Sequence, residues 1–137
     1  MDYGISLGRR FRALKLWMVI RMFGAEGIRE RLRYHIQIAQ AFKRQVEQHP
    51  DFEIVAPVPL SVVCFRYHPR KASVGEQELN RMNEQLMEMV NATGEVFLSH
   101  TKLGERLVLR LAVGNLSTTD EHVSRAWKLL QEKAQQL

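Results

Sequence analysis

A cluster of arginines near the start of the chain is the feature best suited to chemistry. Arg9, Arg10 and Arg12 stand within four positions, directly after Gly8. A guanidinium group can hold a carboxylate or a phosphate through two parallel hydrogen bonds. The cluster can therefore bind an acidic substrate, a phosphate-bearing cofactor or the acidic surface of another protein. The simpler alternative is that these arginines form ordinary salt bridges to a neighbouring domain.

Histidines and the cysteine offer no pattern that is typical of a metal site. His35 lies near the apolar stripe of a predicted helix without a second histidine at ligand spacing, so we interpret it as a core-edge residue. The single Cys64 cannot form an internal disulfide and is interpreted as a small core hydrophobe within a strand. The remaining histidines fall at the ends of elements or in loops: His49, His68, His100 and His122. We predict no metal ligands.

Two neighbouring pairs could suggest catalysis but have better structural explanations. Ser99 and His100 lack an orienting acid and an oxyanion site, so they do not make a catalytic triad. Asp120 and Glu121 are acids at the predicted start of a helix, where negative charge is favourable. No glycine-rich loop of the kind that cradles phosphate is present.

The arginine cluster leads into a helix that is expected to need a partner. Residues 14–23 are apolar apart from Lys15 and Arg21, and at a helical period they cover the whole circumference. Such a helix is normally buried on all sides, and this one is too short and too flanked by charge to span a bilayer. We expect another surface to cover it, with Trp17 as an anchor, and Arg21 to pair with a carboxylate or with carbonyl groups across an interface.

The pattern after this helix predicts a small α+β domain. Gly24 and Gly27 interrupt a first helix over residues 10–23, and a second, amphipathic helix runs to Gln48. Its apolar stripe consists of Ile28, Leu32, Ile36, Ala39, Phe42 and Val46.

Strands are predicted over residues 52–55, 61–67, 95–101 and 106–113, the last two joined by a glycine-bearing turn. A helix begins with the pair Ser73 and Glu76, and we expect it to bury Leu79, Met82, Leu86 and Met89. A final helix begins with the pair Thr118 and Glu121. Both pairs have capping-box spacing, and the final helix buries Val123, Ala126, Trp127 and Leu130. We predict a small, mostly antiparallel sheet with helices on one face, preceded by two N-terminal helices.

Bulk properties indicate one globular domain, residues 1–137, without a targeting signal. Hydrophobic residues make up 45% and charged residues 26% of the 137 positions, and no signal peptide or membrane span is recognisable. Cytoplasmic localisation is the default expectation. Residues 1–48 hold ten Lys or Arg against four Asp or Glu, whereas residues 49–137 hold ten against eleven. We divide the chain into a helical interface segment, 1–48, and an α+β core, 49–137.

The run LGRRFRALKLWMVIRMFG, residues 7–24, resembles a segment of the pyridoxal-phosphate-dependent group II amino acid decarboxylases, and aromatic-L-amino-acid decarboxylases look closest. The similarity continues through Leu32-Arg33-Tyr34-His35, Val63-Cys64-Phe65-Arg66 and His122-Val123-Ser124-Arg125-Ala126-Trp127. It covers essentially all of this chain but only the C-terminal third or less of such an enzyme. The resemblance implies the small C-terminal domain of a fold-type-I enzyme, packed against a large cofactor-binding domain within a homodimer.

The resemblance also bears on the cofactor. In that family a lysine upstream of this region forms the internal aldimine with pyridoxal phosphate, and no matching motif is present here. We therefore expect no covalently bound cofactor and no activity of the chain alone. The arginine that matches Arg9 lies near the active site in the family, so Arg9 is the one catalytic candidate, in a supporting role. We expect Arg12 and Lys15 to be structural.

Three functions compete. The leading hypothesis is a C-terminal segment of a pyridoxal-phosphate-dependent decarboxylase acting on an L-amino acid, with the large domain or a second subunit as partner and with self-association. The second is an RNA-binding module, which a small sheet and a positive charge permit but which lacks paired aromatic residues on its strands. The third is a regulatory or scaffold protein that pairs with a full-length decarboxylase.

Overall fold

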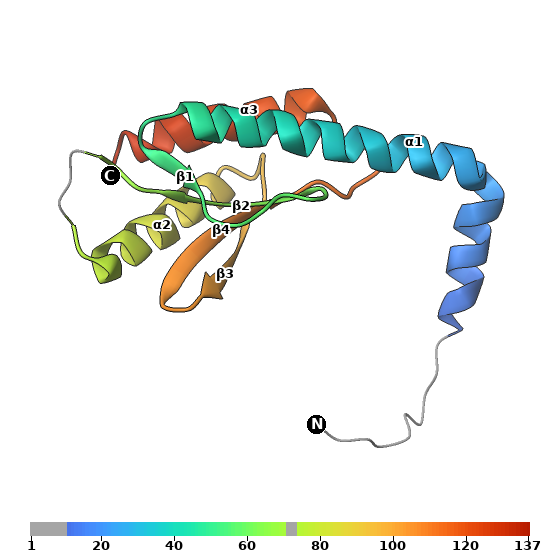
Figure 1. The fold of residues 1–137 in the computed structure, drawn as a ribbon, viewed down its shortest axis with the longest axis horizontal. Helices are drawn as coiled ribbons and strands as arrows, with labels where there is room; N and C mark the ends of the chain where they lie inside the picture. The colour runs from blue at the N-terminus through green and yellow to red at the C-terminus, as the bar shows by residue number, and fades with distance from the viewer. Residues whose placement is uncertain (1–10, 71–73) are drawn as a thin grey trace, which may run out of the picture. The chain divides into compact units, whose positions relative to one another are not determined.

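The computed structural model describes residues 11–70 and 74–137 and divides into two compact units, one ending at Arg33 and the other spanning Tyr34–Leu137. The elements shown in Figure 1 are α1 (Arg12–Gln48), β1 (Phe52–Ile54), β2 (Val62–Tyr67), α2 (Glu76–Asn91), β3 (Ser99–Leu103), β4 (Arg106–Ala112) and α3 (Asp120–Ala134). The predicted order of two strands, a helix, two strands and a helix is confirmed.

Helix α1 consists of two helices that meet at Gly24, as predicted. Gly24 has φ 65° and ψ 170°, a backbone conformation that is essentially restricted to glycine. The expectation that Gly27 also interrupts the helix is wrong, since Gly27 is helical. The predicted start at Arg10 lies outside the described residues.

The four strands form one antiparallel sheet in the order β1-β2-β4-β3. Strands β3 and β4 make a hairpin whose turn contains Gly104 with φ 61°. β3 begins at Ser99, not at the predicted residue 95. The reason is that the side chain of Asn91, at the end of α2, hydrogen-bonds to both the N–H and the carbonyl of Leu98, at 2.7 and 2.9 Å. Leu98 is thereby held to α2, and the pairing with β4 begins at Ser99.

The core of the second unit lies between one face of the sheet and the helices. Figure 1 shows α3 and the second half of α1 side by side over that face. Phe42 of α1 is fully buried, with ring centroids 5.2 Å from Phe65 of β2 and 5.7 Å from Trp127 of α3. Four residues of α1 belong to this core: Ile38, Ala39, Phe42 and Val46. The compact unit therefore begins at Tyr34 and includes the second half of α1, which the sequence analysis assigned to the interface segment.

Helix α2 buries a different stripe from the predicted one. Leu79 and Leu86 are buried as expected, but Met82 and Met89 are half-buried, and Asn83 and Val90 take the inward positions. The predicted opening of this helix by a capping box is also wrong. Its N-cap is Gly75, and Ser73 lies outside the described residues.

Helix α3 has the predicted buried face but starts one residue later than expected. Its N-cap is Thr119, whose backbone N–H donates to Nδ1 of His122 at 3.1 Å. The capping pair is therefore Thr119 and His122, not Thr118 and Glu121. Asp120 and Glu121 occupy the first turn, as their interpretation as helix N-terminal acids requires.

Candidate functional site

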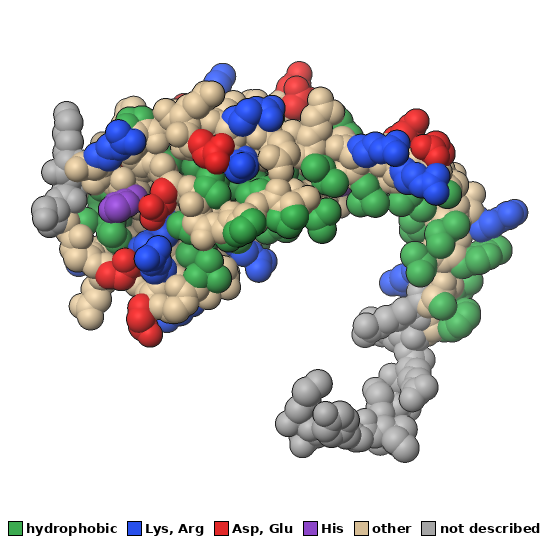
Figure 2. Space-filling model, viewed as in Figure 1, with side chains coloured by type: hydrophobic (Ala, Val, Ile, Leu, Met, Phe, Trp, Pro, Cys, Tyr) green, Lys and Arg blue, Asp and Glu red, His purple; other side chains and the backbone are tan. Residues whose placement is uncertain are grey.

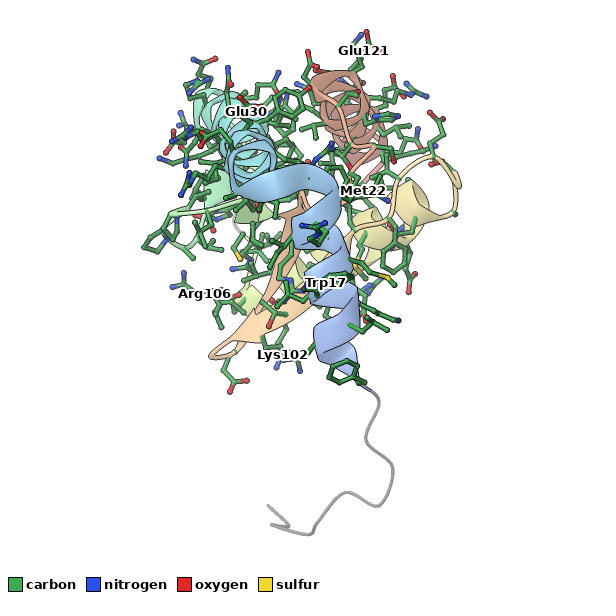
Figure 3. All side chains as sticks on the ribbon, turned by 90° about the vertical axis from the view of Figure 1, so that its right-hand side faces the viewer. Trp17, Met22, Glu30, Lys102, Arg106 and Glu121 are labelled. Carbon is green, nitrogen blue, oxygen red and sulfur yellow. The ribbon has the colours of Figure 1, made fainter. Side chains whose placement is uncertain are left out.

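The helix that follows the arginine cluster presents apolar side chains to solvent. We call residues 11–23 the apolar helix. Figure 2 shows hydrophobic side chains over its surface at the right of the view, and Figure 3 labels Trp17 and Met22 on it. The side chains that are at least two-fifths exposed are Phe11, Leu14, Leu16, Trp17, Met18, Val19, Ile20 and Met22. No helix of the described residues is long and apolar enough to cross a membrane.

Cations within this first unit lie over its aromatic rings. The Arg21 guanidinium carbon is 5.8 Å from the Trp17 ring centroid, and that of Arg31 is 5.0 Å from the Phe23 ring centroid. Such cation–π contacts are worth about 0.5–1 kcal/mol at exposed sites. The carboxylate or carbonyl partner expected for Arg21 across an interface stays a prediction, because the structure describes this chain alone.

Most of the arginine cluster lies outside the residues that the structure describes. Arg9 and Arg10 lie outside the described residues, so the role assigned to Arg9 stays a prediction. Lys15, on the described helix, is exposed. The other described lysines are exposed or half-buried, and Lys43 lies 3.3 Å from Glu47 in an ion pair. A lysine that forms a Schiff base needs an apolar or cationic environment that lowers its pKa. None of these described lysines is buried in such an environment.

The sheet face that the core does not use carries a small group of apolar residues around an arginine. We call Val62, Cys64, Ser99, Arg110 and Ala112 the open face. Val62 pairs with Ala112, and Cys64 pairs with Arg110, which pairs with Ser99 on its other side. Val62 and Ala112 are exposed and the other three are half-buried. Cys64 therefore points away from the core, which corrects its interpretation as a core residue.

Arg110 is a residue that the sequence interpretation did not single out. Its half-buried guanidinium lies in the middle of the open face, where Nε donates to Oγ of Ser99 at 3.3 Å. The structure gives it no carboxylate within salt-bridge distance among the described residues. The signal in the sequence was a single arginine, Arg110, within the otherwise apolar run 107–113. A cation in that position needs an acceptor when its surroundings are desolvated.

A second arginine of the sheet is structural. Arg66 is 2% exposed, and its Nη2 donates to Glu76 at 2.6 Å and to Asn80 at 3.1 Å. This buried cation joins the end of β2 to the first turns of α2. Its Nε is buried without a hydrogen-bond partner, so the network is not fully satisfied.

The other predicted residues do not assemble into a catalytic or metal site. His35 is buried at the edge of the core, as expected. Ser99 and His100 are neighbours on a strand and so point to opposite faces of the sheet. Asp120 accepts a hydrogen bond from the Tyr34 hydroxyl at 3.2 Å, which ties α3 to α1. Within residues 11–70 and 74–137, no group of His, Cys, Asp and Glu could hold a metal ion.

The chain is similar in sequence to known proteins along nearly its whole length. The pyridoxal-dependent decarboxylase conserved domain matches residues 1–68. Phenylacetaldehyde synthase of Arabidopsis thaliana is 46% identical over 99% of this chain, and tyrosine decarboxylase 2 of the same plant is 45% identical over 97%. The chain spans only 27% and 24% of these two proteins.

Solved structures agree in fold. Catharanthus roseus tryptophan decarboxylase in complex with L-tryptophan superposes with a TM-score of 0.83 at 37% identity, over 98% of this chain and 27% of that one. Oryza sativa TDC with PLP and tryptamine gives a TM-score of 0.86 at 37% identity, over 96% of this chain and 28% of that one.

Proposed function

Because the chain is homologous to pyridoxal-phosphate-dependent aromatic amino acid decarboxylases, we propose that it is the C-terminal segment of such an enzyme. The parent enzyme removes the α-carboxylate of an L-amino acid, most simply an aromatic one, as CO2. This segment supplies packing against the cofactor-binding domain and is inactive alone. The single observation that carries the proposal is the match along nearly the whole chain to about a quarter of each relative.

The open face supports the proposal that the chain is one part of a larger protein. Antiparallel strands with one face in water alternate apolar and polar residues, whereas strands buried on both faces read as continuous apolar runs. β2 begins Val-Val-Cys-Phe, and β4 is apolar at every position between Arg106 and Ala112 except Arg110. The core lies on one face of these strands, and on the other face Val108 and Arg66 are already buried, whereas Val62 and Ala112 are exposed. The composition of the open face indicates that another protein surface covers it, with an acceptor for Arg110.

The apolar helix supports the same proposal. Its exposed apolar side chains surround the helix, and a surface of this kind marks a protein interface. The large domain of the parent and its second subunit are the partners we propose, with a homodimer in the cytoplasm. In the absence of these partners, the apolar helix drives self-association.

Pyridoxal phosphate, when bound, supplies an electron sink for the carbanion that decarboxylation leaves. The described lysines of this chain do not fit its covalent anchor, because each is exposed or half-buried. We assign that anchor to the part of the parent outside this chain. Arg9 is the residue of this chain that we propose to assist, by holding a carboxylate or phosphate group from the edge of the site.

Two experiments test the proposal. In the first, the chain is mixed with pyridoxal phosphate, reduced with borohydride and mapped by peptide mass spectrometry. We expect no stoichiometric adduct at one lysine. One dominant adduct that an amino acid competes away would contradict the proposal.

The second experiment asks whether the chain can complete an enzyme. Arabidopsis phenylacetaldehyde synthase lacking the quarter that matches this chain is expressed with and without the chain. We expect the two polypeptides to co-purify, and Arg9→Ala to leave co-purification intact while lowering any recovered turnover. Chains that never associate would contradict the proposed packing role.

The alternatives receive less support. RNA-binding sheets stack bases on exposed aromatic side chains, and the open face carries none. The regulatory or scaffold alternative differs from the leading proposal only in the partner, and association with an intact decarboxylase in place of a truncated one would favour it.

A further inference from the structure

A small cavity opens on the second unit where the C-terminal ends of α1 and α3 lie against the sheet. Its walls come from the turn after α1, the first residue of β1, the last residue of β2 and the end of α3. None of the lining residues belongs to the open face or to the apolar helix. The volume is about 140 Å³. At about 30 Å³ for one water molecule, this space holds a group of about four or five non-hydrogen atoms.

Asp51 gives this cavity a negative charge. Among the described residues, no lysine or arginine side chain forms an ion pair with Asp51, and none lines the cavity. Its Oδ1 accepts the backbone N–H of Arg70 at 3.0 Å, and no described residue donates to Oδ2. Burial, together with the charge of Asp51, raises the pKa of Tyr67. The carboxylate therefore lies close enough to the Tyr67 hydroxyl to set the potential there.

The ends of two helices add to this negative potential. α1 ends at Gln48, next to the lining residue His49, and α3 ends at Ala134, which lines the cavity itself. The C-terminal end of a helix carries partial negative charge and stabilises a nearby cation. His49 does not oppose this effect, because its Nδ1 accepts the N–H of Asp51 at 3.2 Å, which only the neutral ring can do. These features favour a cationic ligand.

The aromatic wall favours a planar cation. The rings of Phe52 and Tyr67 have centroids 5.2 Å apart and are tilted by 55°. Phe52 is buried and Tyr67 is half-buried, so Tyr67 offers the accessible ring. A guanidinium group stacks on aromatic rings and is more weakly hydrated than an ammonium group. Gln131 and Gln135, which also line the cavity, add amide oxygens as acceptors for its N–H groups.

We propose that this cavity binds a guanidinium group, with its N–H groups toward Oδ2 of Asp51 and its plane against the Tyr67 ring. The inference does not depend on the proposed function, because the lining residues lie outside the surfaces assigned to a partner. A single half-buried acid and a small ligand make the binding weak, with a dissociation constant on the order of 1–10 mM. Only the head group fits the cavity, so free guanidinium compounds and the end of an arginine side chain share this chemistry.

The test is a titration of the chain, carrying carbon-13-labelled alanine methyl groups, with methylguanidinium chloride at constant ionic strength. We expect a saturable shift of the Ala134 methyl signal, while the Ala112 signal on the open face stays unchanged. Urea, which is planar and neutral, is the control ligand and should give no saturable shift. A saturable response to urea, equal shifts of Ala112 and Ala134, or no saturation by about 30 mM would overturn the proposal.

A second ligand separates the two sources of the guanidinium group. Nα-acetylarginine amide carries the same head group on the backbone of an amino acid. Binding comparable with that of methylguanidinium assigns the cavity to an arginine side chain of another protein. Loss of binding assigns it to free guanidinium compounds.

Matched variants test the charge at the site. Asp51→Asn keeps an oxygen for the Arg70 N–H and should weaken binding about three- to fivefold. Glu53→Gln removes the same charge from a neighbouring residue that does not line the cavity and should leave binding within about twofold. Equal effects of these two variants would mean a general charge effect and no defined site.

A variant that adds charge keeps the test independent of the folding of Asp51→Asn. Gln135 is exposed and lines the cavity, so Gln135→Glu should strengthen binding about two- to threefold. Gln136→Glu, at an exposed neighbour outside the lining, is its control and should have little effect. Unchanged or weaker binding by Gln135→Glu would contradict a cationic ligand.

Discussion

Asn83 hydrogen-bonds to both backbone polar groups of Tyr67. Its Oδ1 accepts from the Tyr67 N–H, and its Nδ2 donates to the Tyr67 carbonyl, each at 2.8 Å. The ladder between β2 and β4 has ended just before this point, at Phe65 and Leu109. One turn earlier on α2, Asn80 accepts from the Leu107 N–H at 2.8 Å. Two asparagine side chains of a helix therefore replace strand-to-strand hydrogen bonds where the strands diverge.

Asn83→Ala should lower the free energy of unfolding by about 2–4 kcal/mol, because it removes a fully buried side chain and leaves two backbone groups of Tyr67 without partners. Urea denaturation followed by circular dichroism measures the change. Gln85→Ala, on the exposed side of the same helix, is the control and should stay within about 0.5 kcal/mol of the wild type. Equal stability of the two variants would contradict the role assigned to Asn83.

Phe42→Ala should cost about 3–5 kcal/mol through the lost burial and the cavity it leaves. Phe42 has no exposed surface and makes edge contacts with Phe65 and Trp127. Phe97→Ala removes the same side chain from a position that is 85% exposed and should change stability little. The same denaturation experiment compares them, and a small effect of Phe42→Ala would show that the core is centred elsewhere.

Gly24 and Gly27 form a natural pair for testing the break in α1. Gly24→Ala places a side chain at φ 65° and ψ 170° and should cost about 1–3 kcal/mol, or force the break to move. Gly27 is helical, and an added Cβ would meet Phe23 at an ordinary 3.7 Å. Gly27→Ala should therefore raise helix stability by about 0.5–1 kcal/mol. Backbone NMR shifts of residues 20–30 would report both effects, and the same sign for both would refute the assigned backbone geometry.

The apolar helix should control self-association. The double variant Leu16→Lys/Met22→Lys places two charges where the side chains are 62% and 78% exposed and should shift the isolated chain toward monomer. Gln77→Lys/Gln85→Lys adds the same charge to exposed positions of α2 and is the control. Sedimentation velocity over a range of concentrations measures both. An unchanged sedimentation profile of the first variant would mean that another surface is responsible.

The ion pair of Glu95 and Arg125 should have a pH signature. The Arg125 hydrogen bond lowers the folded-state pKa of Glu95 below its ordinary value of 4.5. Its stabilising contribution is therefore complete above that value and is lost as the pH falls through the lowered pKa. In Arg125→Gln, the Glu95 carboxyl should titrate at a higher pH, as followed by its carbon NMR shift. Arg81→Gln, near Glu78 at 3.9 Å, is a control that should leave Glu95 unchanged.

Sequence patterns predicted the elements of this chain better than they predicted its polar contacts. The alternation of β2 and β4 and the order of the elements follow from apolar periodicity, which depends on burial alone. The inward stripe of α2 was predicted correctly at Leu79 and Leu86 and wrongly at Met82 and Met89, because the predicted set fits a helical period as well as the true one does. Asn83 is buried because it completes the hydrogen bonds of a strand that is distant in the sequence, and no local pattern carries that information.

The start of α3 was also predicted one residue away from its true position, because the sequence offers two possible capping pairs. Thr118 with Glu121 and Thr119 with His122 are overlapping pairs at identical spacing. Glutamate is the usual partner in a capping box, so the first pair was the natural prediction. The helix begins one residue later because Thr119 and His122 form the capping pair. For Arg9, the sequence resemblance alone supports the assignment.

The central place of β4 sets an order in which the sheet can assemble. β4 pairs with β3 through the turn at Gly104 and, on its other side, with β2, which is separated from it by all of α2. A short hairpin closes within microseconds, whereas pairing across a long intervening segment must first overcome a larger loop-closure entropy. We therefore expect the β3–β4 hairpin to form early and to act as a template, and the arrival of β2 on it, together with the asparagines of α2, to limit the folding rate.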